Sequence, residues 1–254
     1  MIDIHTHIMP GVDDGARDIH MAIQMIRNAA LGGTTDIILT PHCAEAYGFY
    51  NYDSEELEEY FQSLCREVAR GQIPIRLHAG MEVLYEGKEH FLRNENQFHS
   101  LCGSRYMLIE YYFDVSREEI IEGVETVCAC GYIPIIAHPE RYACVQEECL
   151  LANGKLLLEV REKDALFQVN KGSLAGKHGD RSLQTAEWMF KNDFVDFVAS
   201  DAHNPRFRNA GLRDVQAYIQ KQYGSRRAKR LFEDNPRCII EDRIIGKEQI
   251  GGDR

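Results

Sequence analysis

Two histidines, His5 and His7, stand one residue apart near the N-terminus, in an apolar stretch that is typical of a buried strand. Side chains two residues apart along a strand point the same way, so both imidazoles should face one spot, where a divalent metal could bind them. A single histidine is more often an ordinary core or surface residue, and this pair alone favours neither interpretation. The other candidate ligands of the chain decide between them.

Further candidate ligands end apolar runs along the whole chain. They are His42, His78, Glu82, Glu110, His138, Asp201 and His203. In a parallel barrel the C-terminal ends of the strands meet at one rim, so residues far apart in the sequence converge there. The pattern therefore predicts a metal-binding pocket at the rim of a barrel.

The elements that must position these residues alternate between apolar strands and amphipathic helices. After the opening strand, strands are expected at 36–40, 75–79, 106–110, 133–137, 166–169 and 195–200. Helices are expected at 18–31, from 53 or 54 to about 70, and at 86–93, 117–130, 146–163 and 182–192. Seven strands that alternate with helices favour parallel pairing with right-handed crossovers, and ligands at so many strand ends favour a closed α/β barrel over an open sheet.

The C-terminal part and the composition set further bounds. Two amphipathic helices, about 208–223 and 225–233, are expected to cover one side of the barrel, and residues 246–254 are expected to be poorly ordered. With 254 residues, 44% hydrophobic content and no Pro/Ser-rich linker, the chain fits a single domain over residues 1–254. The formal net charge of −11 and a pI near 5.4 argue against nucleic acid as an extended partner.

No apolar stretch is long enough to span a bilayer, and the early first strand leaves no room for a cleavable signal peptide. The sequence therefore predicts a cytoplasmic protein without membrane insertion. The eight cysteines are expected to be reduced thiols in that compartment. None of them has an arginine six residues later, so the Cys-x₅-Arg signature of thiolate phosphatases is absent.

Two nucleophilic residues have a structural explanation that we prefer to a catalytic one. Cys43 stands beside His42 and is the cysteine expected near the pocket, but a small buried thiol explains it better. Ser173 lies in the segment 172–176 without the Gly-x-Ser-x-Gly register of a serine nucleophile. A structural use at a strand-to-helix turn is the better interpretation of Ser173.

Taken in order, the motifs of the chain resemble a known family from end to end. They are Asp3–His7, Val12–Gly15, Thr40–His42, Ala79–Glu82, Ser104–Glu110, Ala137–Tyr142, Gln168–Asn170, Ser173–Gly176 and Ala199–Asn204. The chain resembles the PHP (polymerase and histidinol phosphatase) superfamily, and more closely its capsule-biosynthesis protein-tyrosine phosphatases, the CpsB/CapC type, from low-GC Gram-positive bacteria. The resemblance implies the PHP fold, a distorted (β/α)7 barrel with covering C-terminal helices.

The resemblance also implies a site for three divalent metal ions. Carried over by position, the ligands would be His5, His7, Glu82 and Asp201 for the first ion, Glu82, Glu110 and His138 for the second, and Asp14, His42 and His203 for the third. Imidazole and carboxylate ligands without a thiolate suit Mn²⁺, Zn²⁺ or Fe, and the number of carboxylates favours Mn²⁺. Such ions can supply a metal-bound hydroxide at neutral pH for attack on a phosphomonoester.

Charge on the transferred phosphoryl group calls for guanidinium partners as well as metal. Arg141 is the first candidate and Arg208 the second, with Arg206 as its alternative; a surface ion pair is the competing interpretation of each. Tyr47 and Tyr50 could pack against the aromatic ring of a phosphotyrosine or merely anchor their loop. The chain departs from its relatives after His42, where Cys43-Ala44-Glu45 replaces a more basic segment.

The resulting prediction is a Mn²⁺-dependent phosphotyrosine phosphatase that acts by metal-bound water, without a cysteine nucleophile. Its partner, implied by the resemblance, is the tyrosine-rich tail of a bacterial tyrosine kinase that controls capsule or exopolysaccharide production. Alternatives are a small-molecule phosphatase of the histidinol-phosphate type and a non-catalytic metal-binding scaffold. A metal-dependent amidohydrolase is less favoured, because no lysine that could bridge two metals occurs between Lys88 and Lys155. The oligomeric state is left open.

Overall fold

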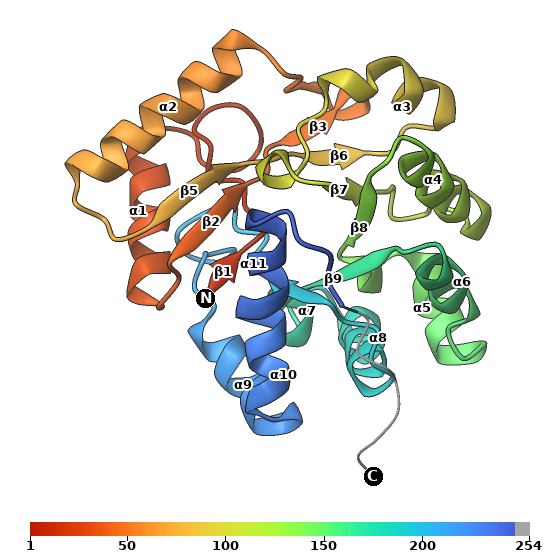
Figure 1. The fold of residues 1–254 in the computed structure, drawn as a ribbon. Helices are drawn as coiled ribbons and strands as arrows, with labels where there is room; N and C mark the ends of the chain where they lie inside the picture. The colour runs from red at the N-terminus through yellow and green to blue at the C-terminus, as the bar shows by residue number, and fades with distance from the viewer. Residues whose placement is uncertain (247–254) are drawn as a thin grey trace.

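The strands form two sheets in the computed structural model, which describes residues 1–246 (Figure 1). The smaller sheet has the order β1-β2-β5 and the larger one the order β10-β9-β8-β7-β6-β3-β4. The strands are β1 (Ile2–Asp3), β2 (Asp36–Leu39), β3 (His42–Ala44), β4 (Phe49–Tyr50), β5 (Arg76–Ala79), β6 (Glu82–Leu84), β7 (Tyr106–Glu110), β8 (Ile133–Ala137), β9 (Leu166–Asn170) and β10 (Phe197–Ala199). Every pairing is parallel except that of β3 with β4.

Two of the expected strands are bent, and the bends explain why there are two sheets. The path of β2 continues into β3 after Pro41, whose ring leaves no N–H for a ladder hydrogen bond. The path of β5 continues into β6 after Gly80, where a Cβ would lie 2.9 Å from side-chain atoms of Ile38 and of Leu101. The expected strands 36–40 and 75–79 are therefore each followed by a second, unpredicted strand.

Seven parallel strand paths stand in barrel order, which confirms the α/β class. The two outer paths meet at one isolated bridge between Thr6 and Ala202, with His7 N–H donating to Ala202 O at 2.9 Å. A continuous closed ladder, as the sequence led us to expect, is not seen among residues 1–246. The barrel is distorted, because single hydrogen bonds and not a continuous ladder join its first and last strand paths.

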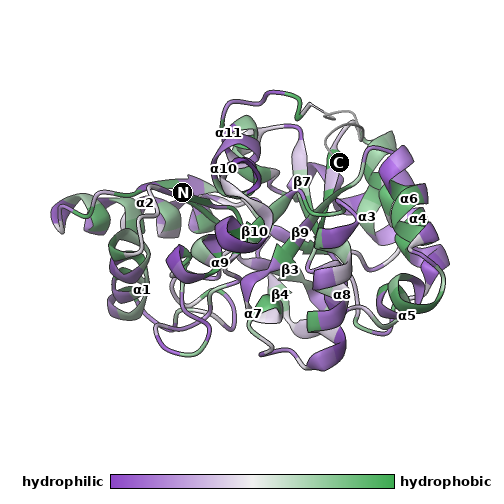
Figure 2. Cartoon of the chain, turned by 90° about the horizontal axis from the view of Figure 1, so that it is seen from below, coloured by the Kyte–Doolittle hydropathy of each residue, from purple (hydrophilic) through white to green (hydrophobic). Residues whose placement is uncertain are grey.

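Successive strand residues face alternately into two hydrophobic clusters. The inner cluster fills the space enclosed by the strands and includes Ile2, Ile4, Ile38, Leu108, Ile135 and Phe197. Neighbouring strand residues such as Met107, Ile136 and Val198 belong instead to the cluster under the helices. Figure 2 shows hydrophobic residues among the central strands and both hydrophobic and hydrophilic faces on the surrounding helices.

The helices lie outside the strands (Figure 1). They are α1 (Ile19–Leu31), α2 (Glu55–Arg70), α3 (Lys88–Asn94), α4 (Arg117–Ala129), α5 (Ala143–Leu151), α6 (Lys155–Glu162), α7 (Lys171–Leu174), α8 (Asp180–Lys191), α9 (Arg213–Tyr223), α10 (Ser225–Lys229) and α11 (Asn235–Ile240). Side-chain caps fix several starts, because Asp18, Ser54 and Ser116 accept backbone N–H groups of their first turns. These starts confirm the expected helices near 18, 54 and 117.

Three expectations about helices need correction. The segment 146–163 is not one helix but α5 and α6, because Asn153 and Gly154 adopt φ of +56° and +67° between them. The helix expected from 208 begins only at Arg213, since 204–212 forms a loop. The helix expected to end near 233 continues through a π-helical turn, Arg230–Asp234, into α11.

The C-terminal helices close the end of the barrel where the strands begin. Ile239 of α11 belongs to the inner cluster, and Tyr106, the first residue of β7, donates its hydroxyl to Arg243 O at 2.8 Å. The carboxyl ends of the strands are left open at the opposite end. Most of the tail expected to be poorly ordered, residues 247–254, lies outside the described residues. Within residues 1–246, no helix combines the length and apolarity needed to cross a membrane.

The buried carboxylate of Asp36 ties the smaller sheet together. Arg76 donates to it through Nε at 2.7 Å and Nη2 at 2.8 Å, and His78 Nε2 lies 3.0 Å from Oδ1. Burial by itself would raise the pKa of Asp36, but these partners outweigh it and lower the pKa to about 2. His78, which was among the candidate metal ligands of the sequence, is thus a structural partner in β5.

We expect Asp36→Asn to destabilise the fold by about 1–2 kcal/mol at pH 7, after allowance for the exposed side of the Arg76 pair. The folded pKa lies below the unfolded value, so the stabilisation is present above about pH 4 and is lost as the pH falls towards about 2. Urea unfolding of both proteins between pH 7 and pH 3 measures this, with Asp180→Asn as a surface control. A difference that stayed constant with pH would contradict it.

Candidate metal site

The nine predicted ligands gather at the open end of the barrel. Eight of them lie on or directly after the carboxyl-terminal half of a strand path, and Asp14 lies in the turn after β1. Three groups of their nitrogen and oxygen atoms could each hold an ion, with ligand atoms within 4.8 Å of one another. They are His5, His7 and Asp201; His42, Glu82 and Glu110; and His7, Asp14, His42 and His203.

The innermost group surrounds His5 and His7. Their Nε2 atoms lie 3.1 Å apart, and each lies close to Glu82, at 3.1 Å from Oε1 and 3.2 Å from Oε2 respectively. Asp201 Oδ1 is 3.7 Å from the first Nε2 and 3.5 Å from the second. Both imidazoles and both carboxylates are buried. Four donor groups therefore converge on one enclosed spot.

Glu82 connects this spot to a second one. His138 Nε2 lies 3.2 Å from Glu82 Oε1 and 3.4 Å from Glu110 Oε1. His42 Nδ1 lies 3.0 Å from Glu82 Oε2 and 3.5 Å from Glu110 Oε2. Glu82 is thus placed between the two groups, as a bridging ligand must be.

The third group lies nearest to solvent. Asp14 Oδ1 is 3.2 Å from His203 Nε2 and 3.6 Å from His42 Nε2, and the Asp14 side chain is 53% exposed. The His7 ring stands between the two imidazoles, with its centre 4.0 Å from that of His203 and 4.3 Å from that of His42. His42 therefore faces the second group through Nδ1 and the third through Nε2.

Hydrogen bonds behind the first pair fix which nitrogen faces the site. His5 Nδ1 lies 2.8 Å from Gln168 Oε1, and His7 Nδ1 lies 2.8 Å from Asp13 Oδ2. Because both oxygens are acceptors, each Nδ1 carries a proton and each Nε2 is the nitrogen that faces the site. Burial by itself would lower the pKa of His7, but Asp13 and Glu82 outweigh it and raise the pKa well above its usual value, so positive charge is favoured where the two Nε2 atoms lie 3.1 Å apart.

Asp13 was not expected to have this role, although its place beside Asp14 in one acidic turn was a signal. The turn packs tightly on the strand end: a Cβ at Gly15 would lie 2.0 Å from His7 O. Asp13 also accepts the backbone N–H of His42 at 3.1 Å and that of Gly15 at 2.9 Å. One carboxylate thus holds two ligand-bearing segments in register.

The protonation behaviour of the cluster shows that it favours positive charge. Burial by itself would lower the pKa of His138, but Glu110 and Glu82 outweigh it and raise the pKa to about 9. Burial would raise the pKa of Glu82, yet His5, His42 and the other imidazoles hold it well below its usual range. Glu82 Oε2 and Glu110 Oε2 make no hydrogen bond although they are buried. A set of nitrogen and carboxylate donors with these properties fits divalent metal ions.

Two of the ligands occupy unusual backbone conformations. His138 has φ of +33° and Asp201 has φ of +48°, each just after the end of its strand. A left-handed φ in a residue other than glycine costs of the order of 1–3 kcal/mol and persists only where surrounding contacts enforce it. Here it turns both side chains into the barrel mouth.

The two arginines that the sequence singled out reach the same place. Arg208 Nη2 donates to Asp201 Oδ1 at 2.8 Å and to Oδ2 at 2.7 Å. Arg141 Nη1 lies 3.7 Å from Asp201 Oδ2, and its guanidinium carbon stands 4.5 Å from the centre of the Phe113 ring. Arg206 is exposed on the same loop as Arg208. Of the two alternatives on that loop, Arg208 is the one in contact with the cluster.

Aromatic residues surround the opening. Tyr47 is 52% exposed and packs edge-on against Tyr112 at 5.9 Å, while Tyr50 on β4 is 65% exposed. Burial and the negative charge of Glu110 raise the pKa of Tyr47. Phe49, unpredicted, stacks on the His42 ring at 5.6 Å.

The cysteines offer no activated thiolate. Cys43 is buried, and burial followed by the charge of Glu45 raises its pKa to about 12. Burial also raises the pKa of each of the other cysteines, Cys65, Cys102, Cys128, Cys130, Cys144, Cys149 and Cys238. A thiolate nucleophile needs the opposite shift.

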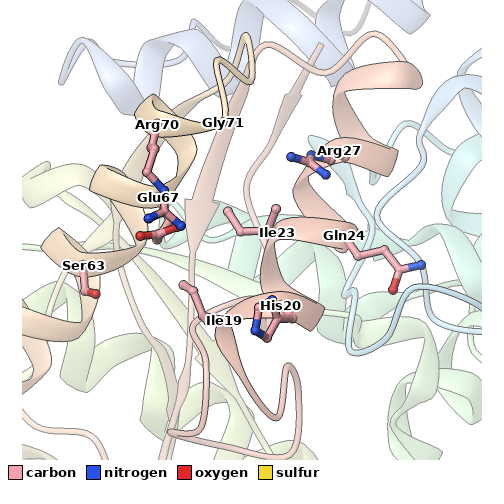
Figure 3. A pocket seen from close by; sticks show the side chains of 9 residues that line it. All are labelled: Ile19, His20, Ile23, Gln24, Arg27, Ser63, Glu67, Arg70 and Gly71. Carbon is pink, nitrogen blue, oxygen red and sulfur yellow. The ribbon is translucent and has the colours of Figure 1, made fainter.

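A separate cavity of about 530 Å³ lies between α1 and α2 (Figure 3). Arg70 and Glu67 form an ion pair of 2.7 Å on its α2 wall, and Ile19 and Ile23 face it from α1. None of the nine predicted ligands lines it. This cavity is therefore not part of the metal site.

Residues 1–241 match the family model for capsular polysaccharide synthesis proteins of the CpsB/CapC type. The chain belongs to this family. It is 34% identical over 251 residues to the tyrosine-protein phosphatase YwqE of Bacillus subtilis, covering 98% of this chain and 94% of YwqE. It is 30% identical over 253 residues to the tyrosine-protein phosphatase CpsB of Streptococcus pneumoniae, covering 96% and 100% of the two chains.

Solved structures agree with this assignment. One solved structure superposes on this chain with a TM-score of 0.85. It belongs to the crystal structures of YwqE from Bacillus subtilis and CpsB from Streptococcus pneumoniae, which are described as unique metal-dependent tyrosine phosphatases. The sequence identity is 33%, and the match covers 97% of this chain and 96% of the other. The likeness to the CpsB/CapC family that the motifs suggested is confirmed.

We expect Asp13→Asn to lower the affinity for Mn²⁺ by about 10–100-fold, because His7 would lose the carboxylate that fixes its tautomer and raises its basicity. Titration of the chelator-treated protein with Mn²⁺ by calorimetry measures the change, and circular dichroism checks the fold. Asp180→Asn, an exposed residue on α8, is the matched control. An unchanged affinity in Asp13→Asn would show that the His7 contact does not support metal binding.

Proposed function

We propose that this CpsB/CapC family member is a metal-dependent protein-tyrosine phosphatase that acts as one catalytic domain over residues 1–254. The observation that carries the proposal is the cluster of nine donor residues, eight in the three groups and His138 beside Glu82 and Glu110, with two guanidinium groups at its edge. YwqE and CpsB, which match nearly end to end, are named tyrosine-protein phosphatases. The chemistry needed at a phosphomonoester and the residues present therefore agree.

Three divalent ions, with Mn²⁺ preferred over Fe or Zn²⁺, suit the donor set. The ligands would be His5, His7, Glu82 and Asp201; Glu82, Glu110 and His138; and Asp14, His42 and His203. When bound, such ions lower the pKa of water and neutralise charge on the phosphoryl group. Gln168 and Asp13 hold the Nε2 atoms of His5 and His7 towards that position.

The arginines act on the phosphate. Arg141 and Arg208 both stand beside Asp201, where their planar N–H groups can bind phosphoryl oxygens in pairs. Arg208 is half-buried and already ordered by its contact with the carboxylate, so less side-chain entropy is lost when it turns to a phosphate. Tyr47 and Tyr50, both more than half exposed, would contact the substrate ring.

A phosphotyrosine on a polypeptide fits this mouth better than a small enclosed substrate does. The Asp14 side chain is 53% exposed and two tyrosines beside the opening are more than half exposed, so the outermost ligand group is accessible from solvent. A histidinol phosphatase would use a similar cluster, and this remains the competing enzyme. The physiological substrate that we propose is the tyrosine-rich tail of a bacterial kinase of capsule synthesis, in the cytoplasm.

Removal of metal separates the enzyme from a metal-binding scaffold. We expect dialysis against a chelator to lower hydrolysis of a phosphotyrosine peptide by about 10³-fold or more, and added Mn²⁺ to restore it. Initial rates on phosphotyrosine peptide, phosphoserine peptide and histidinol phosphate should rank the first highest. Faster turnover of histidinol phosphate would favour the small-molecule phosphatase, and bound metal without any turnover would favour the scaffold.

Substitution of ligands and thiols separates metal chemistry from cysteine chemistry. We expect His203→Ala to lower kcat on the phosphotyrosine peptide by roughly 10²-fold or more, because the outermost ion loses a ligand. Cys43→Ser should retain most of the activity, because the thiol is buried and protonated. Loss of activity in a folded Cys43→Ser protein would contradict the proposed mechanism.

A further inference from the structure

A cavity of about 830 Å³ opens beside the metal cluster, between the segment 170–178 and the segment 207–218. Asp201 and Arg208 line it, so it is continuous with the proposed catalytic site. Its other walls carry Leu174, His178, Phe207, Val215 and Tyr218. Pockets of about 300–1,000 Å³ enclose a drug-sized ligand, so this cavity can hold more than a phosphotyrosine side chain.

Two lysines hold the walls of the cavity together. Lys171 Nζ donates to Gly211 O at 2.7 Å and to Asn209 Oδ1 at 3.0 Å, and it also contacts Asn209 O. Nearer the surface, Lys177 Nζ donates to Phe207 O at 2.9 Å. The loop that carries Arg208 is thereby fixed to the segment after β9. The cavity is preformed and does not need to be opened by a ligand.

The hydrogen bonds around His178 define its Nε2 atom as an acceptor. Ser173 Oγ lies 2.6 Å from Glu140 Oε1, an oxygen that also accepts the backbone N–H of Asn170, so the hydroxyl donates to it. His178 Nδ1, 3.0 Å from Ser173 Oγ, must then donate its proton to that hydroxyl. The Nε2 atom of His178 then carries a lone pair, and within residues 1–246 the side-chain hydrogen bond of this histidine is the one from Nδ1.

The position of this imidazole is enforced by its surroundings. A Cβ at Gly172 would lie 2.7 Å from His178 Cε1, so a larger residue there would displace the ring. Burial lowers the pKa of His178 to about 4, and the positive charge of Arg141 adds to the shift. The ring is therefore neutral at pH 7 and presents an acceptor, which repels phosphate oxygens and attracts an N–H group.

We propose that this cavity binds the polypeptide that flanks the phosphorylated tyrosine, with His178 Nε2 accepting a backbone N–H of the substrate and Phe207 packing on one of its apolar side chains. The inference rests on the proposed function and deepens it. An acceptor in a cavity that also presents the apolar side chains of Leu174, Phe207 and Val215 matches the repeating N–H groups and side chains of a peptide. Phe207 is 80% exposed and belongs to the same loop as Arg208, so contact with the flank and contact with the phosphate are linked.

The first test compares two substrates with Mn²⁺-loaded enzyme. We expect His178→Leu and Phe207→Ala each to lower the ratio of kcat/KM for a phosphotyrosine peptide to kcat/KM for p-nitrophenyl phosphate by about 3–10-fold, the value of one hydrogen bond or apolar contact. Tyr60→Ala removes an exposed aromatic side chain from α2, far along the chain from the cavity, and should leave the ratio unchanged.

The second test asks whether His178 binds a backbone N–H. A series of peptides is methylated at one backbone nitrogen at a time. One methylated position should raise KM about 3–10-fold with the wild-type enzyme and have little further effect in His178→Leu, because the hydrogen bond is already lost there. A merely structural role of His178 would not produce this coupling.

The outcomes distinguish the inference from the function on which it rests. Wild-type enzyme that hydrolyses neither substrate with Mn²⁺ would overturn both. Wild-type enzyme that hydrolyses the peptide, with a substrate ratio unaffected by either variant or with no coupling to methylation, would overturn the peptide subsite and leave the phosphatase intact. A lowered ratio together with coupling at one amide supports the subsite.

Discussion

The buried carboxylates of Glu82, Glu110 and Asp201 impose the constraint on which the rest of this structure depends. His5 Nε2 lies 3.1 Å from Glu82 and 3.7 Å from Asp201, and His138 Nε2 lies 3.2 Å from Glu82 and 3.4 Å from Glu110. Negative charges gathered out of water cost several kcal/mol each unless positive charge compensates them. The protein supplies part of that compensation through Arg208 on Asp201 and through a His138 pKa raised to about 9. Divalent ions would supply the rest, so metal binding and the order of the mouth are expected to be coupled.

The fold meets this constraint by bending its backbone where the ligands stand. The paths of β2 and β5 turn at Pro41 and Gly80, which brings His42 and Glu82 into register as neighbours across β3 and β6. Left-handed φ values aim His138 and Asp201 inward at the ends of their strands. The opposite end of the barrel, plugged by α11, is packed as a hydrophobic core, and the left-handed residues there, such as Cys102 and Asp242, lie in turns and are not among the ligands.

The sequence predicted where along the chain the candidate ligands lie better than it predicted the backbone geometry that brings them together. Apolar runs ending in Glu, His or Asp marked β7, β8 and β10 well, because an unbent strand leaves a clear pattern. The apolar run before His78 wrongly suggested a metal ligand at that residue, which contacts Asp36 instead. The strand bends at Gly80, and Glu82 after the bend is the residue that reaches the barrel mouth. Periodicity reports which face of a strand a residue occupies, but not where the strand changes direction. The supporting role of Asp13 and the break between α5 and α6 depend likewise on tertiary contacts and on single φ values.

A cluster of metals and arginines can act on any phosphomonoester, so selectivity has to come from the segments around it. Two of these segments, 170–178 and 207–218, are joined by Lys171 and Lys177 and share a cavity with Arg208. Burial lowers the pKa of Lys171 to about 8, so the contact that holds the loop keeps a positive charge in an unfavourable environment. A loop that only carried one arginine to a phosphate would not need such a contact. It is understandable if the same loop must also present a fixed wall to a polypeptide, which couples recognition of the chain around the tyrosine to placement of the phosphate.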